Sequence, residues 1–216
     1  MKKLIPLLLI VSLACVSCSS SEAWNDKVYV KGNTYLWHLE LQQPVWNDIN
    51  VGSFSLSAPI GLQPDIELFV DELGGATNIS TYALAPTEYL SGSFELLHDY
   101  KEGTDLYFHV HWQGKAAPTG TDNVQWQLEY VIARHETTLN PITTITIETP
   151  FDTQYEFKRS DFALIAGAGF VIGDQFLFRL SRIAASVDEY AGDALLATVG
   201  IHYQIDTIGS STLENK

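Results

Sequence analysis

The stretch "TDLYFHVHW", residues 104–112, alternates apolar and polar side chains along its length. One face would carry the apolar side chains, namely Leu106, Phe108, Val110 and Trp112. The other face would carry the polar ones, Tyr107, His109 and His111. A period of two over this many residues predicts a half-buried β-strand, because successive side chains of a strand point to opposite faces.

The same alternation recurs along most of the chain. It is clear in "NVQWQLEYVIA" (123–133), "DQFLFRLSRIAA" (174–185) and "DALLATVGIHYQID" (193–206), with turn signals such as "GKAAPTGTDN" (114–123) between such stretches. Eight to ten short strands predict an all-β fold, an antiparallel two-sheet β-sandwich that is jelly-roll-like. We expect this domain over residues 35–208, after a linker or N-terminal arm at 19–34 and before a tail at 209–216.

The charge balance limits the partners. The chain has 216 residues with 26 acidic and 12 basic side chains, which give a formal net charge of -14. Nucleic-acid binding needs clustered Lys and Arg to neutralise phosphates, so this composition argues against it. It also argues against a charge-driven contact with an anionic lipid surface.

The first 18 residues read as an export signal. Lys2 and Lys3 form a positive start, and residues 4–14 are apolar but too short to cross a bilayer. The sequence around Cys15 resembles a bacterial lipobox, and the sequence around Cys18 matches it less well. The prediction is a protein exported to the cell surface, lipid-anchored through Cys15 or Cys18; the alternative is an ordinary cleaved signal. These are the only two cysteines, so cleavage would leave no disulfide in the mature domain.

The histidines suggest a metal site as one hypothesis. Gly103 followed by His109 and His111 resembles the opening of a cupin metal pattern, and neutral imidazoles suit Zn, Fe, Ni and Cu. The acid expected just after the second histidine is missing, and Lys115 stands near that place. A site of His109, His111 and His202 requires the last strand to lie beside the first histidine strand. The simpler interpretation is a polar outer face paired with carboxylates, with no cofactor.

Other chemistry has little support in the sequence. There is no G-x-S-x-G and no P-loop, so acyl transfer and nucleotide hydrolysis have no anchor, and we expect no enzymatic activity. Trp112 and Trp126 fall on faces predicted to be core. Trp46 is freer and is a candidate for stacking on a sugar.

Three stretches together resemble a group of bacteriophage virion structural proteins. They are "PVWNDINV" (44–51), "LLHDYKEGTDLYFHVHW" (96–112) followed by "VQWQLEY" (124–130), and "DEYAGDALLATVGIHYQIDTIGSS" (188–211). The resemblance implies a β-sandwich particle component of the head- or tail-fibre-like type, non-enzymatic, favouring a homotrimer that contacts other virion proteins. The matching residues that become assembly candidates are Trp46, Asp48, His98 and Glu129. An export signal is a departure from that group, and a gene of prophage origin captured for a surface role would account for it.

Three hypotheses follow. The first is a non-enzymatic structural or assembly protein that resembles a phage virion component, located in the virion. The second is an exported surface lipoprotein that binds a glycan or another partner through Trp46 or loop aromatics. The third is a cupin-like metalloprotein.

Overall fold

The computed structural model describes residues 40–61 and 63–213. The predicted export segment with Cys15 and Cys18, the linker and the last three residues of the tail lie outside the described residues. Within the described part, no helix has the length and apolar character needed to cross a membrane.

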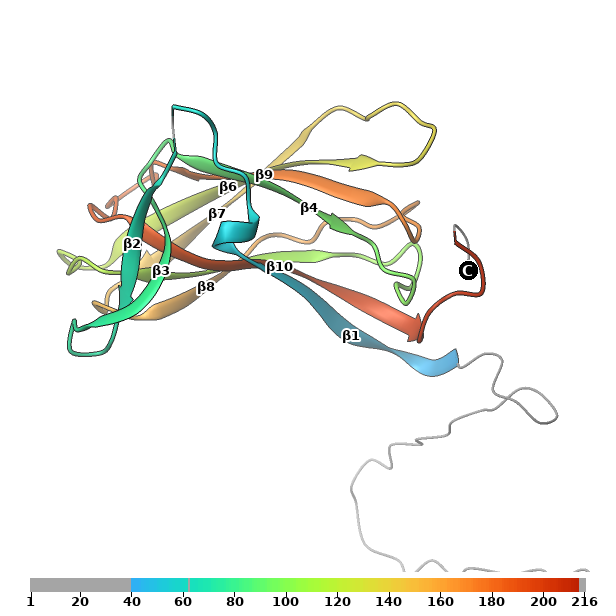
Figure 1. The fold of residues 1–216 in the computed structure, drawn as a ribbon, viewed down its shortest axis with the longest axis horizontal. Coiled ribbons are helices and arrows are strands. Elements are labelled where there is room, and N and C mark those ends of the chain that lie inside the picture. Colours follow the sequence, from blue (N-terminus) through green and yellow to red (C-terminus); the bar gives the residue numbers. More distant parts are fainter. Residues whose placement is uncertain (1–39, 62, 214–216) are drawn as a thin grey trace, which may run out of the picture.

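The described residues form two antiparallel sheets (Figure 1). The first sheet, called sheet A, has the order β2 (Asp65–Val70), β3 (Ala76–Leu84), β10 (Ala194–Thr207), β5 (Tyr107–Gly114) and β8 (Phe157–Asp161), with β1 (Glu40–Gly52) also paired to β10. The second, sheet B, has the order β4 (Tyr89–Glu95), β9 (Gln175–Ile183), β6 (Asp122–Ala133) and β7 (Thr143–Phe151). A short 3-10 helix, η1 (Ser53–Ser55), follows β1.

The strand order confirms the predicted jelly-roll-like sandwich. The strands β3 to β10 are divided between the sheets in the orders 3-10-5-8 and 4-9-6-7. This is the arrangement of an eight-stranded jelly roll, in which the chain crosses repeatedly between two facing sheets. Strands β1 and β2 are additions to sheet A, and β1 and β3 pair with different parts of the same edge of β10.

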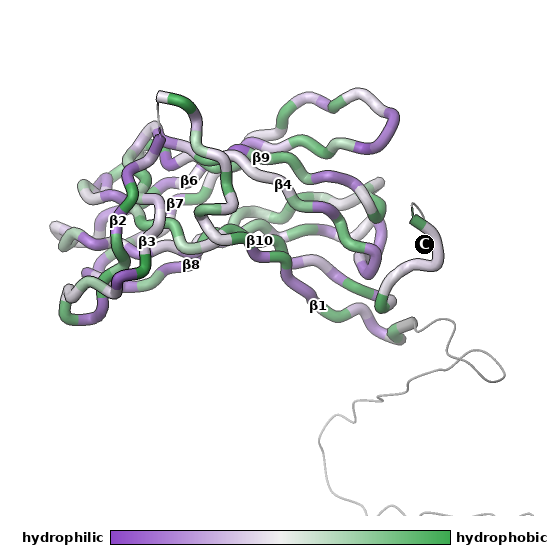
Figure 2. Tube along the Cα trace, in the orientation of Figure 1, coloured by the Kyte–Doolittle hydropathy of each residue, from purple (hydrophilic) through white to green (hydrophobic). Residues whose placement is uncertain are grey.

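The core lies between the sheets and contains the apolar sets read from the alternation. The side chains of Leu106, Phe108, Val110 and Trp112 are fully buried, as are Val124, Trp126 and Leu128 from β6. The rings of Trp112 and Trp126 meet edge to face across the core, with centroids 6.3 Å apart. Figure 2 shows hydrophobic and hydrophilic residues alternating along much of the chain. Burial of large apolar side chains on both inner faces holds the two sheets together.

Candidate functional site

The outer face of sheet A brings together residues from three strands. Strand β10 lies between β1 and β5, so the last strand does lie beside the first histidine strand. Its His202 is opposite Asp48 of β1 on one side and opposite Tyr107 of β5 on the other. In the next row, Gly200 is opposite Asn50 and His109. We call the group Asp48, Asn50, His109, His111 and His202 the histidine face.

The side chains of this face are in close contact. The Nε2 of His109 is 3.3 Å from the Oδ1 of Asn50 and 3.9 Å from the Oδ2 of Asp48. The other oxygen of Asp48, Oδ1, is 3.7 Å from the Nδ1 of His202. The imidazole rings of His109 and His202 are stacked with centroids 4.4 Å apart. One carboxylate therefore reaches both imidazoles, and Nδ2 of Asn50 donates a 2.5 Å hydrogen bond to it.

The bare backbone of Gly200 makes this packing possible. A Cβ at this position would lie 2.6 Å from the Nε2 of His109 and 2.3 Å from the Oδ1 of Asn50. The side chains of Asn50 and His109 therefore occupy the space above Gly200 of β10 that the side chain of any other residue would fill. A glycine inside a strand weakens it, so its presence here marks a close approach of side chains from either side.

Burial changes the protonation of two histidines. His109 is only 1% exposed although it points to the outer face of the sheet. Burial lowers its pKa to about 4, against the opposing effect of the Asp48 charge. The pKa of His111 is also lowered, mainly by burial and then by the charge of Arg159. The imidazole of His109 is thus neutral near pH 7, as a metal ligand must be.

The predicted metal ligands differ in one residue from the group that the structure brings together, which has Asp48 in place of His111. The ligand atoms of Asp48, His109 and His202 lie within 4.8 Å of one another. His111 lies beside His109, with ring centroids 5.0 Å apart, and its ring also stacks on Phe157. The sequence had nominated Asp48 only for assembly, and Asn50 and Gly200 not at all. Only the register of β1 against β10 reveals the carboxylate's place.

An exposed aromatic pair borders the histidine face. The ring of Trp46 meets the ring of Tyr107 edge to face, with centroids 5.3 Å apart. Trp46 is 54% exposed and Tyr107 is 38% exposed, whereas Trp112 and Trp126 are in the core as predicted. Trp46 is opposite Gln204 in the register of β1 and β10. We call Trp46 and Tyr107 the aromatic pair.

The remaining assembly candidates do not share this surface. His98 follows β4, and its Nδ1 is 2.6 Å from the hydroxyl of Ser210. Glu129 lies on sheet B, where it accepts a hydrogen bond from Arg179 of the neighbouring strand β9. Of the four residues taken from the virion resemblance, Trp46 and Asp48 are neighbours on one face of β1, Glu129 lies on sheet B and His98 lies in the connection after β4.

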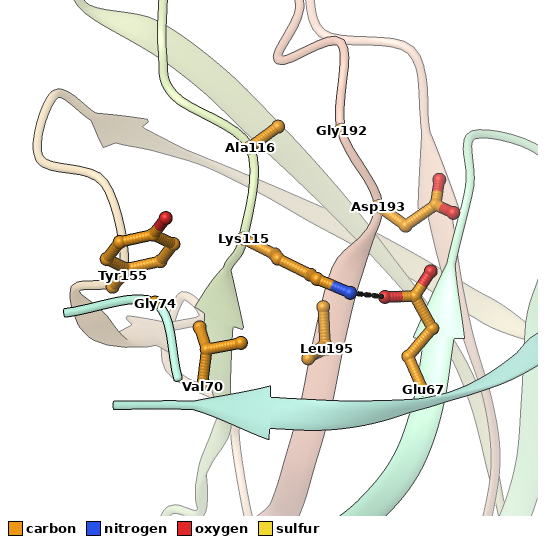
Figure 3. A pocket seen from close by; sticks show the side chains of 9 residues that line it. All are labelled: Glu67, Val70, Gly74, Lys115, Ala116, Tyr155, Gly192, Asp193 and Leu195. Carbon is orange, nitrogen blue, oxygen red and sulfur yellow. Dashed lines mark hydrogen bonds and ion pairs between the residues drawn. The ribbon is translucent and has the colours of Figure 1, made fainter. Parts of the chain in front are cut away.

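A separate pocket of about 440 Å³ lies beside the β2–β3 hairpin (Figure 3). Its lining includes Val70, Tyr155 and Asp193, and the side chain of Lys115 extends across it. The Nζ of Lys115 makes a 2.9 Å ion pair with Glu67. No sequence pattern indicates this pocket, because its walls come from loops and strand ends far apart in the chain. It contains no histidine and does not include the aromatic pair.

Comparisons with known proteins found similarity to solved structures alone. No family model and no curated protein matches the chain. Among solved structures, dimeric latent PorU from Porphyromonas gingivalis is similar over 77% of this chain, with 9% identity and a TM-score of 0.39; the chain spans 13% of its length. TmCBM61 in complex with β-1,4-galactotriose is similar over 74% of this chain and 88% of its own, with 10% identity and a TM-score of 0.28. The CBM22-2 xylan-binding domain of Paenibacillus barcinonensis Xyn10C is similar over 75% and 99%, with 13% identity and a TM-score of 0.33.

Proposed function

We propose that the chain is a non-catalytic glycan-binding module and that the aromatic pair is its platform. The observation that carries the proposal is the exposure of Trp46 and Tyr107 together on the outer face of sheet A. Large aromatic side chains are normally withdrawn into the core, and this fold has buried Trp112 and Trp126 completely. Two adjacent exposed rings therefore indicate a binding surface.

The chemistry around the rings suits a sugar. The apolar C–H face of a pyranose ring can lie on the Trp46 indole, because this ring is broad, rigid and apolar. The hydroxyl groups of the sugar need polar partners beside that platform. Asp48 and His202 supply acceptors and donors in the neighbouring row, and Gln204 lies opposite Trp46. An apolar surface with a few polar groups at its rim is the usual form of a small-molecule site.

The predicted export agrees with this role. The signal pattern of residues 1–18 would place the module outside the cytoplasm, where polysaccharides and glycoconjugates are exposed. The resemblance to phage virion proteins and the homotrimer stay predictions, and so does lipid attachment at Cys15 or Cys18.

A glycan array followed by affinity measurements on one oligosaccharide hit tests the proposal. We expect Trp46→Ala and Tyr107→Ala each to weaken binding by tenfold or more, since each removes a stacking surface. Phe54→Ala is the matched control: Phe54 is 53% exposed and meets Tyr82 edge to face at 5.1 Å, away from the histidine face. This variant should bind as the wild type does. A flat array, or binding that survives both platform substitutions, would reject the proposal.

A further inference from the structure

We propose that Asp48, His109 and His202 form a binding site for a divalent transition-metal ion, with Zn²⁺ as its representative, on the outer face of sheet A. The site requires no glycan and does not depend on the function proposed above. Its ligands come from β1, β5 and β10, three adjacent strands of one sheet.

The distances are close to those of a coordinated ion. Zinc bonds of about 2.0–2.2 Å in a tetrahedral arrangement place ligand atoms about 3.3–3.6 Å apart. The two distances from the Asp48 oxygens are 3.9 Å to His109 and 3.7 Å to His202. All three ligand atoms lie within 4.8 Å of one another. Small rotations of the Asp48 and His202 side chains, which are 31% and 34% exposed, close the remaining gap.

The ligand types also fit. Two imidazoles and one carboxylate are a donor set for Zn²⁺ and neighbouring first-row ions. Three protein ligands on an outer face leave at least one coordination position open toward solvent. The hydrogen bond from Asn50 to the carboxylate orients the acidic ligand, as outer partners commonly do at metal sites.

The buried histidine supplies a second, independent observation. His109 is 1% exposed, and its Nε2 is the ring nitrogen that faces the Asp48 carboxylate, at 3.9 Å. Within residues 40–61 and 63–213, this nitrogen has only the 3.3 Å contact with Asn50 as a hydrogen bond. Buried polar atoms in native proteins are nearly always satisfied, so a buried ring nitrogen that faces a carboxylate with one long hydrogen bond points to a ligand.

The surroundings of the site favour a cation. The chain carries a net charge of -14, which raises the local concentration of cations around it. The basic side chain nearby on the same face, Arg159, is paired at 3.0 Å with Asp161. Gly200 keeps the space between Asn50 and His109 free of a side chain, as shown above.

Isothermal titration of the untagged, EDTA-treated protein with ZnCl₂, together with visible absorption of the Co²⁺ form, tests the site. We expect one ion per chain. The d–d absorption bands of the Co²⁺ form should have the high intensity that is typical of a Co²⁺ ion with a low coordination number. His202→Ala and Asp48→Asn should each weaken Zn²⁺ binding at least tenfold. These two residues are partly exposed, so both variants should fold, which thermal melting in EDTA verifies.

The control is His135→Ala. His135 is 80% exposed and lies 3.5 Å from Glu136, so it offers an imidazole and a carboxylate outside the site. It should bind Zn²⁺ as the wild type does, and so should Trp46→Ala, which separates this test from the glycan test. Lack of Zn²⁺ binding by the wild type up to millimolar concentration would overturn the proposal. So would binding that survives both ligand substitutions, or an equal loss in His135→Ala.

Discussion

Two buried, ionisable side chains of this sandwich differ in how many hydrogen bonds the surrounding protein supplies to them. Arg182 of β9 and His109 of β5 are 0% and 1% exposed. The Nη atoms of Arg182 donate four hydrogen bonds, to the carbonyls of Leu84, Gly192 and Tyr190 and to the Glu189 carboxylate, at 2.6 to 2.9 Å. Only its Nε lacks a partner among the described residues. The imidazole of His109 has, within the same part of the chain, one hydrogen bond, of 3.3 Å.

The difference separates a structural polar group from a binding one. Arg182 reaches from sheet B to the Leu84 carbonyl at the end of β3 in sheet A and also holds the loop carbonyls of Tyr190 and Gly192, so both of its Nη atoms are hydrogen-bonded. The imidazole of His109 is held near a carboxylate and a second imidazole without good hydrogen bonds. A buried polar group whose hydrogen bonds the protein supplies needs no ligand, whereas a buried polar group with poor hydrogen bonds indicates a ligand.

The largest effect is expected for Arg182→Met. This substitution keeps most of the side-chain volume but leaves the Glu189 carboxylate and three carbonyls without their donor. Breaking a buried charged network of this kind costs about 3–5 kcal/mol of unfolding free energy. Urea denaturation followed by tryptophan fluorescence measures the loss.

Arg179→Met is the control for that change. Arg179 is another arginine of β9, and its side chain is 44% exposed and paired with Glu129 on the surface. Its loss should cost less than about 1 kcal/mol, because exposed ion pairs contribute little. Equal losses of unfolding free energy in the two variants would show that the buried hydrogen-bond network of Arg182 stabilises the fold no more than a surface ion pair does.

A smaller effect is expected for Gly200→Ala. The new Cβ would meet the Oδ1 of Asn50 and the Nε2 of His109 at distances far below van der Waals contact. Relief requires displacing both side chains, and we expect a loss of about 2 kcal/mol, within the range of overpacked sites. Gly52→Ala on the same sheet is the control, because nothing lies within 4 Å of a Cβ there. Comparable urea midpoints for the two variants would argue against the close packing described for Gly200.

The sequence predicts the sandwich and its core well, for a physical reason. Alternation with a period of two is a local property, so Trp112 and Trp126 could be assigned to the core without knowing which strands are neighbours. The pairing of strands is not local. Asp48 meets His202 across more than 150 positions of the chain, and no pattern within either stretch encodes that register.

The site was only partly predictable for the same reason. His109 and His202 stood out because of residue type, but the hypothesis required them to be joined by His111, the neighbour along the strand. The structure brings Asp48 to them from a different strand. The burial of His109 was also unexpected, since it depends on the missing side chain of Gly200 on the adjacent strand. That information lies in neither strand alone.

The smallest effect concerns pH and the neutral state of His109. The charges that face it are those of Asp48 on β1, His202 on β10, His111 on β5 and Asp161 on β8. Burial outweighs the two carboxylates and lowers its pKa to about 4, against about 6.5 in an unfolded chain. The unfolded state therefore binds a proton at higher pH than the folded state does. Stability from this residue is fully present above pH 6.5 and falls as the pH drops toward 4.

Between pH 6.5 and 5.5, this linkage should remove about 1 kcal/mol of unfolding free energy that a His109→Gln variant does not lose. Urea denaturation in EDTA at the two pH values gives the slope of unfolding free energy against pH for the wild type and for His109→Gln. The difference between the two slopes measures the effect of His109, because the carboxylates common to both proteins cancel. If His109→Gln has the wild-type slope, the pKa of His109 is the same in the folded and the unfolded chain, so the Asp48 charge offsets the effect of burial. The surroundings would then accept the charged imidazole, as they accept the Arg182 guanidinium, and the contrast between the two side chains would disappear.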